Sequence, residues 1–445
     1  MKKCSIIKTF YLLLVVSVFI PLSNSCNTVK QTFDPKDLSY LYNPTKNPIN
    51  PRFNVVNQSD ESSNLSVKFF ANDLFFSEAN PQGIPTSSLL VTVKLYNISQ
   101  GRLLSDTVVY NLNIIREEGR REYVYTMPLK VKKGIEYITE VKILDRLRQK
   151  VVQAFVPFNT LSYNNKYNFR AQGLFDGNEL FNPVLRINEY INLIYLRAPV
   201  DSIYISYYKP FTDFADPPSL VLPEKVLDYE PEKVVAIAYS DTTPMMFPRE
   251  GIYLCTVGRD IKEGYTFFNM GATYPTMSDP KSMIEPLSYL ASQNELSNLK
   301  SALKPKFALD DFWIKCGGNV ERARELIRIY YTRVLYANYY FTSYKEGWRT
   351  ERGMIYIIYG PPDKVYKSSE GESWGYRNPV LKSKWGGRYT VSDNYLFFSF
   401  KVRNNNFSDN DYYLSRGETL VTNWDKAILS WRKGIVFRLD NPEGI

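Results

Sequence analysis

The sequence predicts a multidomain, mainly β protein: two β-sandwich domains of immunoglobulin-like type, followed by a C-terminal α+β domain. Two observations carry this prediction. Short apolar runs, roughly 8–15 residues apart and divided by turn clusters such as Asn80–Gly83, fill the chain from residue 51 to residue 280. From about residue 281 the apolar residues adopt a helical period. The length of 445 residues favours two to four domains.

The N-terminus has the order of a secretory leader. Lys2, Lys3 and Lys8 give a positive start, Phe10–Leu22 is almost wholly apolar, and small or polar residues then lead to Cys26. The apolar stretch is shorter than the ~20 residues that span a bilayer. We therefore expect the chain to be exported.

Cys26 stands where bacterial lipoproteins carry their lipidated cysteine. The aliphatic residue that usually lies three places before that cysteine is replaced by Ser23 here, with Leu22 one place earlier. We expect residues 1–25 to be a signal peptide and Cys26 to be lipidated, which would place the chain on a membrane of the cell envelope. The alternative is a cleaved leader and a soluble protein. The polar, proline-containing residues 26–50 are expected to be a tether.

The composition excludes several kinds of site. The sequence contains no histidine, which excludes a histidine base, a Ser–His–Asp triad and an imidazole zinc site within this chain. The net charge of +9 becomes +6 when the three leader lysines are removed, and no dense Lys/Arg block is present, so we expect no nucleic-acid partner. Asp/Asn-rich stretches at 392–396 and 407–412 lack EF-hand spacing. We predict no metal and no cofactor.

Two cysteines remain besides Cys26 and Cys4 of the leader. An oxidising compartment would permit a disulfide between Cys255 and Cys316, and two buried free thiols are the alternative.

The region 51–157 is expected to form the first β-sandwich domain. Its apolar runs, several of them alternating, are 65–76, 88–98, 107–115, 122–131, 137–145 and 151–158. The region 158–280 has the same pattern of short apolar runs and turns, with more proline, and we expect a second β-rich domain. Its strand candidates are 191–198, 202–211, 233–240, 251–260 and 264–274.

The region 281–445 is expected to combine helices with strands. Leucines in 284–303 favour one face of a helix, with Glu285 near its start. The stretch 319–341 is a stronger case, because Asn319 is a suitable N-cap after two glycines. Its expected buried stripe consists of Ala323, Leu326, Ile327, Tyr330, Val334 and Phe341.

The segment after the second helix reads GWRTERGMIYIIYGPPDKVY. Gly347 would end the helical region, and Trp348 is a large apolar anchor. Thr350 can hydrogen-bond nearby backbone, and Glu351 and Arg352 offer a local charge pair.

The second half of this segment is expected to contain a strand between two turns. Gly353 permits the first turn, and Met354–Tyr359 is an apolar run of strand length. Gly360, Pro362 and Asp363 belong to a rigid turn that leaves this strand.

The segment resembles the GWxTD domain family of bacterial envelope proteins, which is frequent in Bacteroidetes lipoproteins. The resemblance includes FALDDFW and RIYYTRVLYANYYF upstream, and GESWGY, GGRYTVSDNYLFFSF and DNDYYL downstream, so that it covers about 284–420. Glu351 stands where the family has aspartate. The resemblance implies residence at the outer membrane, on its periplasmic or surface face, and it implies no activity. The motif residues are Gly347, Trp348, Thr350, Glu351, Arg352, Gly353, Tyr359, Gly360, Pro362 and Asp363.

Three functions are consistent with these features. We favour a non-catalytic scaffold or interaction protein, whose C-terminal domain binds an envelope protein or a cell-wall glycan. The first alternative is a hydrolase of polysaccharide or peptidoglycan with Glu351 and Asp363 as candidate catalytic carboxylates, and the second is a surface glycan-binding module. Charged and aromatic residues that could serve such sites are Glu351, Arg352, Asp363, Glu370, Glu372, Trp374, Trp385 and Arg388. The competing interpretation is that the tryptophans pack the core and the charge pair orders a turn.

Overall fold

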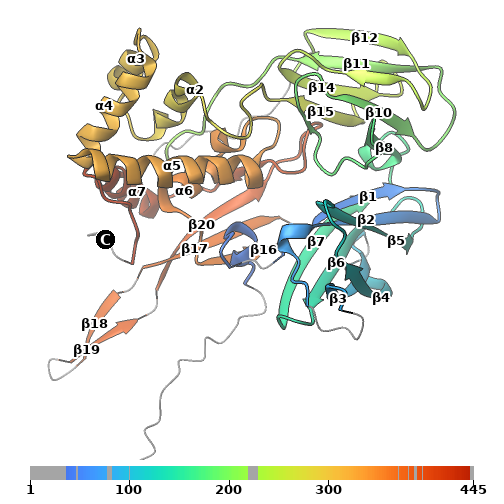
Figure 1. Cartoon of the computed structure of the whole chain (residues 1–445), viewed down its shortest axis with the longest axis horizontal. Coiled ribbons are helices and arrows are strands. Elements are labelled where there is room, and N and C mark those ends of the chain that lie inside the picture. Colours follow the sequence, from blue (N-terminus) through green and yellow to red (C-terminus); the bar gives the residue numbers. More distant parts are fainter. Residues whose placement is uncertain are drawn as a thin grey trace, which may run out of the picture. The chain divides into compact units, whose positions relative to one another are not determined.

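The chain is built mainly of β-sheets, with a helical region in its C-terminal part (Figure 1). The structure is a computed structural model. It describes residues 37–46, 49–77, 83–99, 101–218, 229–368, 370–378, 380–384, 388–392 and 394–440. All of these belong to one compact unit, Lys36–Ile445. The expected signal peptide and Cys26 lie outside the described residues. Among the described residues, no helix has both the length and the apolar character needed to cross a bilayer.

The first β region consists of two antiparallel sheets. One sheet has the order β1-β2-β5 and the other β4-β3-β6-β7. Side chains alternate along each strand, and the inward-facing ones of both sheets form one hydrophobic cluster that includes Leu65, Val91 and Val141. The strands are β1 (Arg52–Asn57), β2 (Ser62–Phe70), β3 (Thr86–Asn97), β4 (Leu103–Ile115), β5 (Glu122–Lys130), β6 (Glu136–Asp145) and β7 (Lys150–Asn159).

The second β region also consists of two sheets. Their orders are β13-β10-β8 and β12-β11-β14-β15-β9, and Phe169, Ile203 and Phe267 belong to the cluster that they share. All five strand candidates of this region coincide with strands. The strands are β8 (Phe169–Gly173), β9 (Val184–Leu185), β10 (Tyr190–Tyr195), β11 (Ser202–Tyr208), β12 (Lys233–Ala238), β13 (Pro244–Met246), β14 (Gly251–Thr256) and β15 (Tyr265–Asn269).

The C-terminal region packs helices against the antiparallel sheet β16-β17-β20-β21 (Figure 1). Phe341 of α5 contacts Trp374 of β17, and Tyr359 of α6 contacts Phe398 of β20, with ring centroids 5.2 and 4.9 Å apart. A separate hairpin pairs β18 with β19. The elements are α2 (Pro280–Ile284), α3 (Gln293–Lys300), α4 (Pro305–Gly317), α5 (Val320–Phe341), α6 (Glu351–Tyr359), α7 (Glu418–Arg432), β16 (Lys364–Lys367), β17 (Gly371–Arg377), β18 (Val380–Lys384), β19 (Arg388–Ser392), β20 (Tyr395–Val402) and β21 (Tyr412–Leu414).

The prediction for α5 is confirmed. Asn319 caps the helix by accepting a hydrogen bond from the Arg322 N–H at 2.8 Å. The expected stripe is buried except for Ile327, which is partly buried. The prediction of one helix over 284–303 is wrong. Pro286 lies in a 3-10 turn, and Ser292 with Glu295 forms a capping box that starts a new helix, α3.

The prediction of a strand at Met354–Tyr359 is also wrong. These residues belong to α6, whose N-cap is Thr350. A short apolar run fits a buried strand and a buried helix equally well. The run is buried on every side, because α6 lies between α5, the sheet and α7, so its sequence lacks the polar face that marks a surface helix.

The expected tether at 26–50 differs from the structure in its later part. Leu38 and Tyr42 are buried in the core of the C-terminal region, and the Leu38 N–H donates to the Val365 carbonyl oxygen at 2.8 Å. Tyr42 contacts Phe341 and Trp374, with ring centroids 5.0 and 5.2 Å apart. Apolar and aromatic side chains give this part of the chain enough buried surface to become part of the fold.

A disulfide between Cys255 and Cys316 is contradicted, because both thiols are free and buried. Cys255 lies in the core of the second β region and Cys316 in the core of the helical region. Burial raises the pKa of both thiols, which keeps them protonated and unreactive.

Candidate functional site

The GWxTD-like turn, residues 347–353, consists of the 3-10 turn Gly347–Arg349, Thr350 and the first residues of α6, and it depends on close backbone contacts. The 3-10 turn Gly347–Arg349 lies against α5, and a Cβ on Gly347 would come closer than 3.0 Å to the Ala337 carbonyl oxygen. A Cβ on Gly353 would overlap the Gly347 carbonyl oxygen in the same way. Both positions therefore need glycine because neighbouring backbone fills the space that a side chain would occupy.

Trp348 and Thr350 hold the turn in place through burial and hydrogen bonds. Trp348 is fully buried, and its backbone N–H donates to Asn338 Oδ1 of α5 at 3.1 Å. The Thr350 hydroxyl donates to the Gly347 carbonyl oxygen at 2.7 Å and accepts from the Gly353 N–H at 3.0 Å. The bond from Gly353 satisfies an N–H group that the start of α6 would otherwise leave unpaired, and the other two hold the 3-10 turn in place.

Glu351 and Asp363, the two candidate catalytic carboxylates, have internal partners. Glu351 accepts a hydrogen bond from the Leu414 N–H, and its other oxygen lies 2.8 Å from the Arg416 guanidinium. Asp363 accepts from the Arg377 N–H at 2.8 Å. Glu351 begins α6 and Asp363 lies beyond its end, and neither lines the cavity described below. Their geometry therefore gives no support to a pair of hydrolytic carboxylates.

A buried charge cluster surrounds Glu372. This side chain is 1% exposed and lies 3.2 Å from Arg352 and 2.8 Å from Lys367. Its oxygens also accept from the Tyr42 hydroxyl and from Trp374 Nε1. Burial alone would raise the pKa of Glu372, but the two cations outweigh it and hold the pKa at about 2. The cluster therefore binds the segment around Tyr42 to the C-terminal sheet.

The remaining candidates are dispersed. Trp374 is a core residue and Glu370 is exposed on the turn before β17. Arg388 lies in β19, and Trp385 lies outside the described residues. Pro362 and Gly360 form the turn after α6, where Gly360 has a φ of 85° and Tyr376 donates to its carbonyl oxygen.

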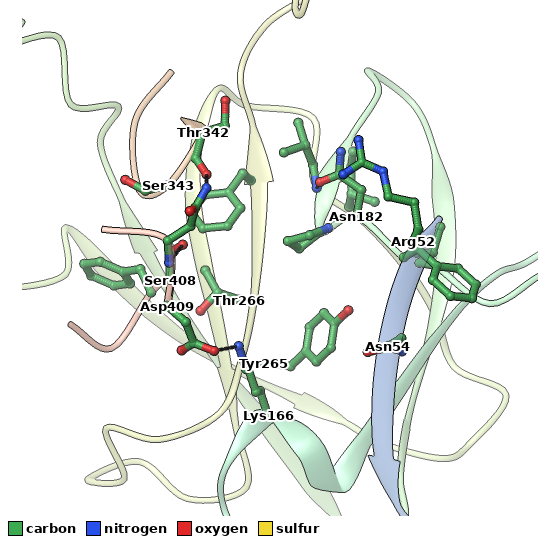
Figure 2. A pocket seen from close by; sticks show the side chains of 18 of the residues that line it. Arg52, Asn54, Lys166, Asn182, Tyr265, Thr266, Thr342, Ser343, Ser408 and Asp409 are labelled. Atoms are coloured by element: carbon green, nitrogen blue, oxygen red, sulfur yellow. Dashed lines mark hydrogen bonds and ion pairs between the residues drawn. The ribbon is translucent and has the colours of Figure 1, made fainter. Parts of the chain in front are cut away.

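A cavity of about 1000 Å³ lies where the three regions meet. In Figure 2, Arg52, Asn54 and Asn182 lie on one side of it, and Thr342, Ser408 and Asp409 lie on the opposite side. The Tyr265 ring projects between these walls. The lining comes from stretches that are far apart in the sequence: 52–55, 180–187, 264–268, 338–343 and 405–410.

The wall at 405–410 is held by Arg352 of the GWxTD-like turn. Arg352 donates to both the carbonyl oxygen and the side-chain oxygen of Asn410 and stacks 3.7 Å from the Tyr412 ring centre. Asn410 Nδ2 in turn donates to the carbonyl oxygens of Tyr340 and Thr342, at 3.1 and 2.9 Å. The turn therefore positions the cavity wall without lining it.

Polar groups in the cavity differ in whether they have partners. Asp409 is paired with Lys166 and accepts from the Tyr167 hydroxyl at 3.2 Å. The Tyr265 hydroxyl has no hydrogen-bond partner within the described part of the chain. Burial, with a smaller effect from the charge of Glu179, raises the pKa of Tyr265, so its hydroxyl stays protonated and is able to donate.

Most residues that line this cavity carry no functional signal in the sequence. Residues 407–412 are recognisable there only as a loop with close Asp and Asn residues. The run Asn404–Asn406 next to it is the one signal in the sequence, because asparagines stabilise turns through their side chains. Asn405 does so here, since its side-chain oxygen accepts from the N–H groups of Phe407 and Ser408, both at 2.8 Å. Among the described residues, no three His, Cys, Asp or Glu side chains cluster as metal ligands would.

The fold and the turn together define a protein with a β-rich N-terminal part and a C-terminal domain of helices on a small sheet. The family model of the GWxTD domain matches residues 251–433, so this is a GWxTD domain-containing protein. The match begins earlier than the stretch 284–420 that the sequence indicates, and it includes β14 and β15.

Other comparisons add little. A search among curated proteins found no match. Two solved structures with local similarity are Bacteroides uniformis beta-glucuronidase and a calcium-binding mutant of Bacteroides uniformis beta-glucuronidase 2, at 13% and 15% identity. The matches cover 28% and 25% of this chain but 14% and 13% of those chains, with TM-scores of 0.18 and 0.17. These similarities bear on neither the fold nor the function of this chain.

Proposed function

We propose that this protein is an exported lipoprotein of the cell envelope that acts by binding, without catalysis, and that the cavity between its three regions is the site for a glycan. In this proposal Cys26 carries the lipid at the outer membrane. The two β regions are immunoglobulin-like sandwiches that act as spacers and help to form the site.

The proposal rests on one contrast. The polar groups of the turn are bonded to other groups of the chain, whereas the cavity has polar and aromatic groups in its lining. Thr350, Glu351 and Arg352 have internal partners, so they are occupied in holding the structure together. The cavity instead offers tyrosine rings and the side-chain amides of Asn182 and Asn406. Aromatic faces with a few placed polar groups, at a junction of domains, are typical of ligand sites.

A binding measurement tests the glycan proposal. The full-length protein, purified in detergent, would be titrated calorimetrically with oligosaccharides prepared from the cell wall and surface polysaccharide of the source bacterium. We expect saturable binding that Tyr265→Phe weakens, because this variant loses only a hydroxyl that lines the cavity. Tyr190→Phe is the matched control, since Tyr190 is exposed and does not line the cavity. Unaltered binding in Tyr265→Phe would count against the cavity as the site.

The absence of catalysis is tested separately. The same oligosaccharides, incubated with the protein, should release no new reducing ends. Release that Glu351→Gln abolishes would contradict the proposal and restore the hydrolase alternative.

The membrane location is tested at Cys26. We expect radioactive palmitate to label the wild-type protein in growing cells, and Cys26→Ala to lose both the label and membrane attachment. A labelled or membrane-bound Cys26→Ala protein would contradict lipid anchoring at this residue.

A protein partner is a second candidate, because the edge strand β4 exposes apolar side chains. Leu103, Leu104, Val109 and Ile115 are each more than half exposed, and within the described residues β4 pairs only with β3. Cross-linking in whole cells from a residue of β4 would identify such a partner. Recovery of no cross-linked companion would count against it.

A further inference from the structure

The cavity carries an excess of positive charge. Its lining contains Arg52, Lys166 and Arg186, against one carboxylate, Asp409. Lys166 and the Tyr167 hydroxyl already bind that carboxylate. The two arginines are therefore the charges that a ligand would meet.

Arg52 is the arginine that the fold positions. It begins β1, and its guanidinium stacks on the Tyr339 ring of α5, 4.1 Å from the ring centre. Stacking uses the face of the guanidinium and leaves its N–H edge available. Among the described residues, no carboxylate pairs with Arg52 and no acceptor binds its guanidinium. In Figure 2 this side chain extends into the cavity on the same side as Asn182.

The groups around Arg52 are suited to hydroxyl-bearing rings. Asn182 uses its side-chain oxygen to accept from the Val184 N–H at 3.1 Å, which leaves its NH₂ group as a donor. The Tyr265 hydroxyl is a second donor. Tyr339 and Tyr340 add aromatic surface to the lining.

We propose that the cavity binds an acidic glycan, and that Arg52 is the ligand of a sugar carboxylate. The inference rests on the proposed function, because it specifies the class of glycan for the same site. A planar carboxylate matches the two parallel N–H groups of a guanidinium, and partial burial strengthens the bond. Asn182 and Tyr265 donate to ring hydroxyls near the charged group, and Arg186, which is exposed, adds to the positive potential at the cavity.

The test compares two oligosaccharides of the same sugar and length, one with charged carboxylates and one with neutral methyl esters. Galacturonan oligosaccharides of one length, with free or methyl-esterified carboxyl groups, would be titrated calorimetrically into the full-length protein in detergent. We expect the free acid to bind at least about 10-fold more tightly than the ester, since one charge-assisted hydrogen bond is lost in the ester. The difference should shrink at high salt.

Variants assign the effect to Arg52. Arg52→Ala should weaken binding of the free acid about 10-fold to 100-fold and leave binding of the ester unchanged. Arg52→Lys should retain part of the affinity for the free acid, because lysine keeps the positive charge but lacks the two parallel N–H groups of a guanidinium. Arg116→Ala is the matched control: Arg116 also stacks on an aromatic ring, that of Phe76, and lies outside the cavity. Thermal unfolding of each variant shows whether it is folded.

Four outcomes would overturn the inference. Equal affinity for acid and ester, or an Arg52→Ala variant that binds the acid normally, would exclude a carboxylate at Arg52 and leave the glycan proposal intact. No binding of either oligosaccharide, when glycans from the source bacterium do bind, would exclude the acidic polymer as the class of ligand. No binding of any of these glycans would overturn the proposed function as well.

Discussion

The turn around Gly347 and the cavity use similar residues for opposite purposes. In the turn, Thr350, Glu351 and Arg352 donate to or accept from groups of the chain itself. In the cavity, the Arg52 guanidinium and the Tyr265 hydroxyl have no such partners among the described residues. A conspicuous motif can therefore serve packing alone, while the residues available to a ligand are scattered in the sequence and belong to no motif.

The two regions are joined through Arg352 and Asn410. Because Arg352 belongs to the turn and Asn410 to the cavity wall, loss of the turn should change the shape of the cavity. Turn variants should therefore reduce stability first and binding as a consequence. Variants of Arg52 or Tyr265 should reduce binding alone.

Gly353→Ala should have the largest effect on stability. The added Cβ would overlap the Gly347 carbonyl oxygen, and backbone cannot move aside as a flexible side chain can. We expect the free energy of unfolding, measured by chemical denaturation, to fall by about 3 kcal/mol or more. Gly417→Ala is the control, because a Cβ there meets no atom within 4 Å. Equal stability of the two variants would contradict a packing role for the turn.

Glu372→Gln should destabilise the protein nearly as much at neutral pH, because it leaves Arg352 and Lys367 without their buried carboxylate. We expect a loss of about 3–5 kcal/mol in the free energy of unfolding. The pKa of about 2 lies below the ordinary value of a glutamate. The stability that Glu372 provides is therefore complete above about pH 4.5 and lost as the pH falls toward 2.

The pH dependence of the unfolding free energy tests this prediction. The difference in unfolding free energy between wild type and Glu372→Gln should shrink by about 3 kcal/mol between pH 6 and pH 2. Glu370→Gln, a change at an exposed neighbour, should follow the wild type throughout. A difference that does not change with pH would show that the carboxylate is not held ionised by its two cations.

Asn410→Ala should affect both properties, since Asn410 joins the two regions. Its loss leaves the Tyr340 and Thr342 carbonyl oxygens without a donor and removes an acceptor of Arg352. We expect a loss of about 1–3 kcal/mol in the free energy of unfolding and weaker glycan binding by calorimetry. The control is Asn404→Ala, an exposed asparagine nearby that does not line the cavity. Full glycan binding by a destabilised Asn410→Ala variant would contradict the inference that the turn maintains the shape of the cavity.

Glu351→Gln should have the smallest effect. Its side chain and that of Arg416 are 18% and 11% exposed, and a glutamine oxygen would still accept from the Leu414 N–H. We expect a loss of about 1 kcal/mol in the free energy of unfolding and unchanged glycan binding. A large loss of binding without loss of stability would contradict the assignment of Glu351 to the structure.

Much of the fold was predictable because it depends on local patterns. The strands β3 to β7 and β10 to β12 follow apolar runs, and α5 follows a helical period with a capping asparagine. The predictions that failed involved segments whose surroundings decide their conformation. Met354–Tyr359 is buried on all sides, so its sequence has no polar face that would distinguish a helix from a strand. Tyr42 is a core residue because the C-terminal sheet offers it partners.

The mainly β character, the helical C-terminal region and the resemblance of the turn to the GWxTD domain all follow from the sequence, since each depends on residues that are neighbours in the chain. Tertiary structure alone decided that the motif glycines are needed for close packing and that Glu351 is tied to Arg416. It alone brought Arg52, Tyr265 and Asp409 to one cavity. Contacts between residues hundreds of positions apart leave no periodic signal in a single sequence, because only the folded chain brings them within bonding distance.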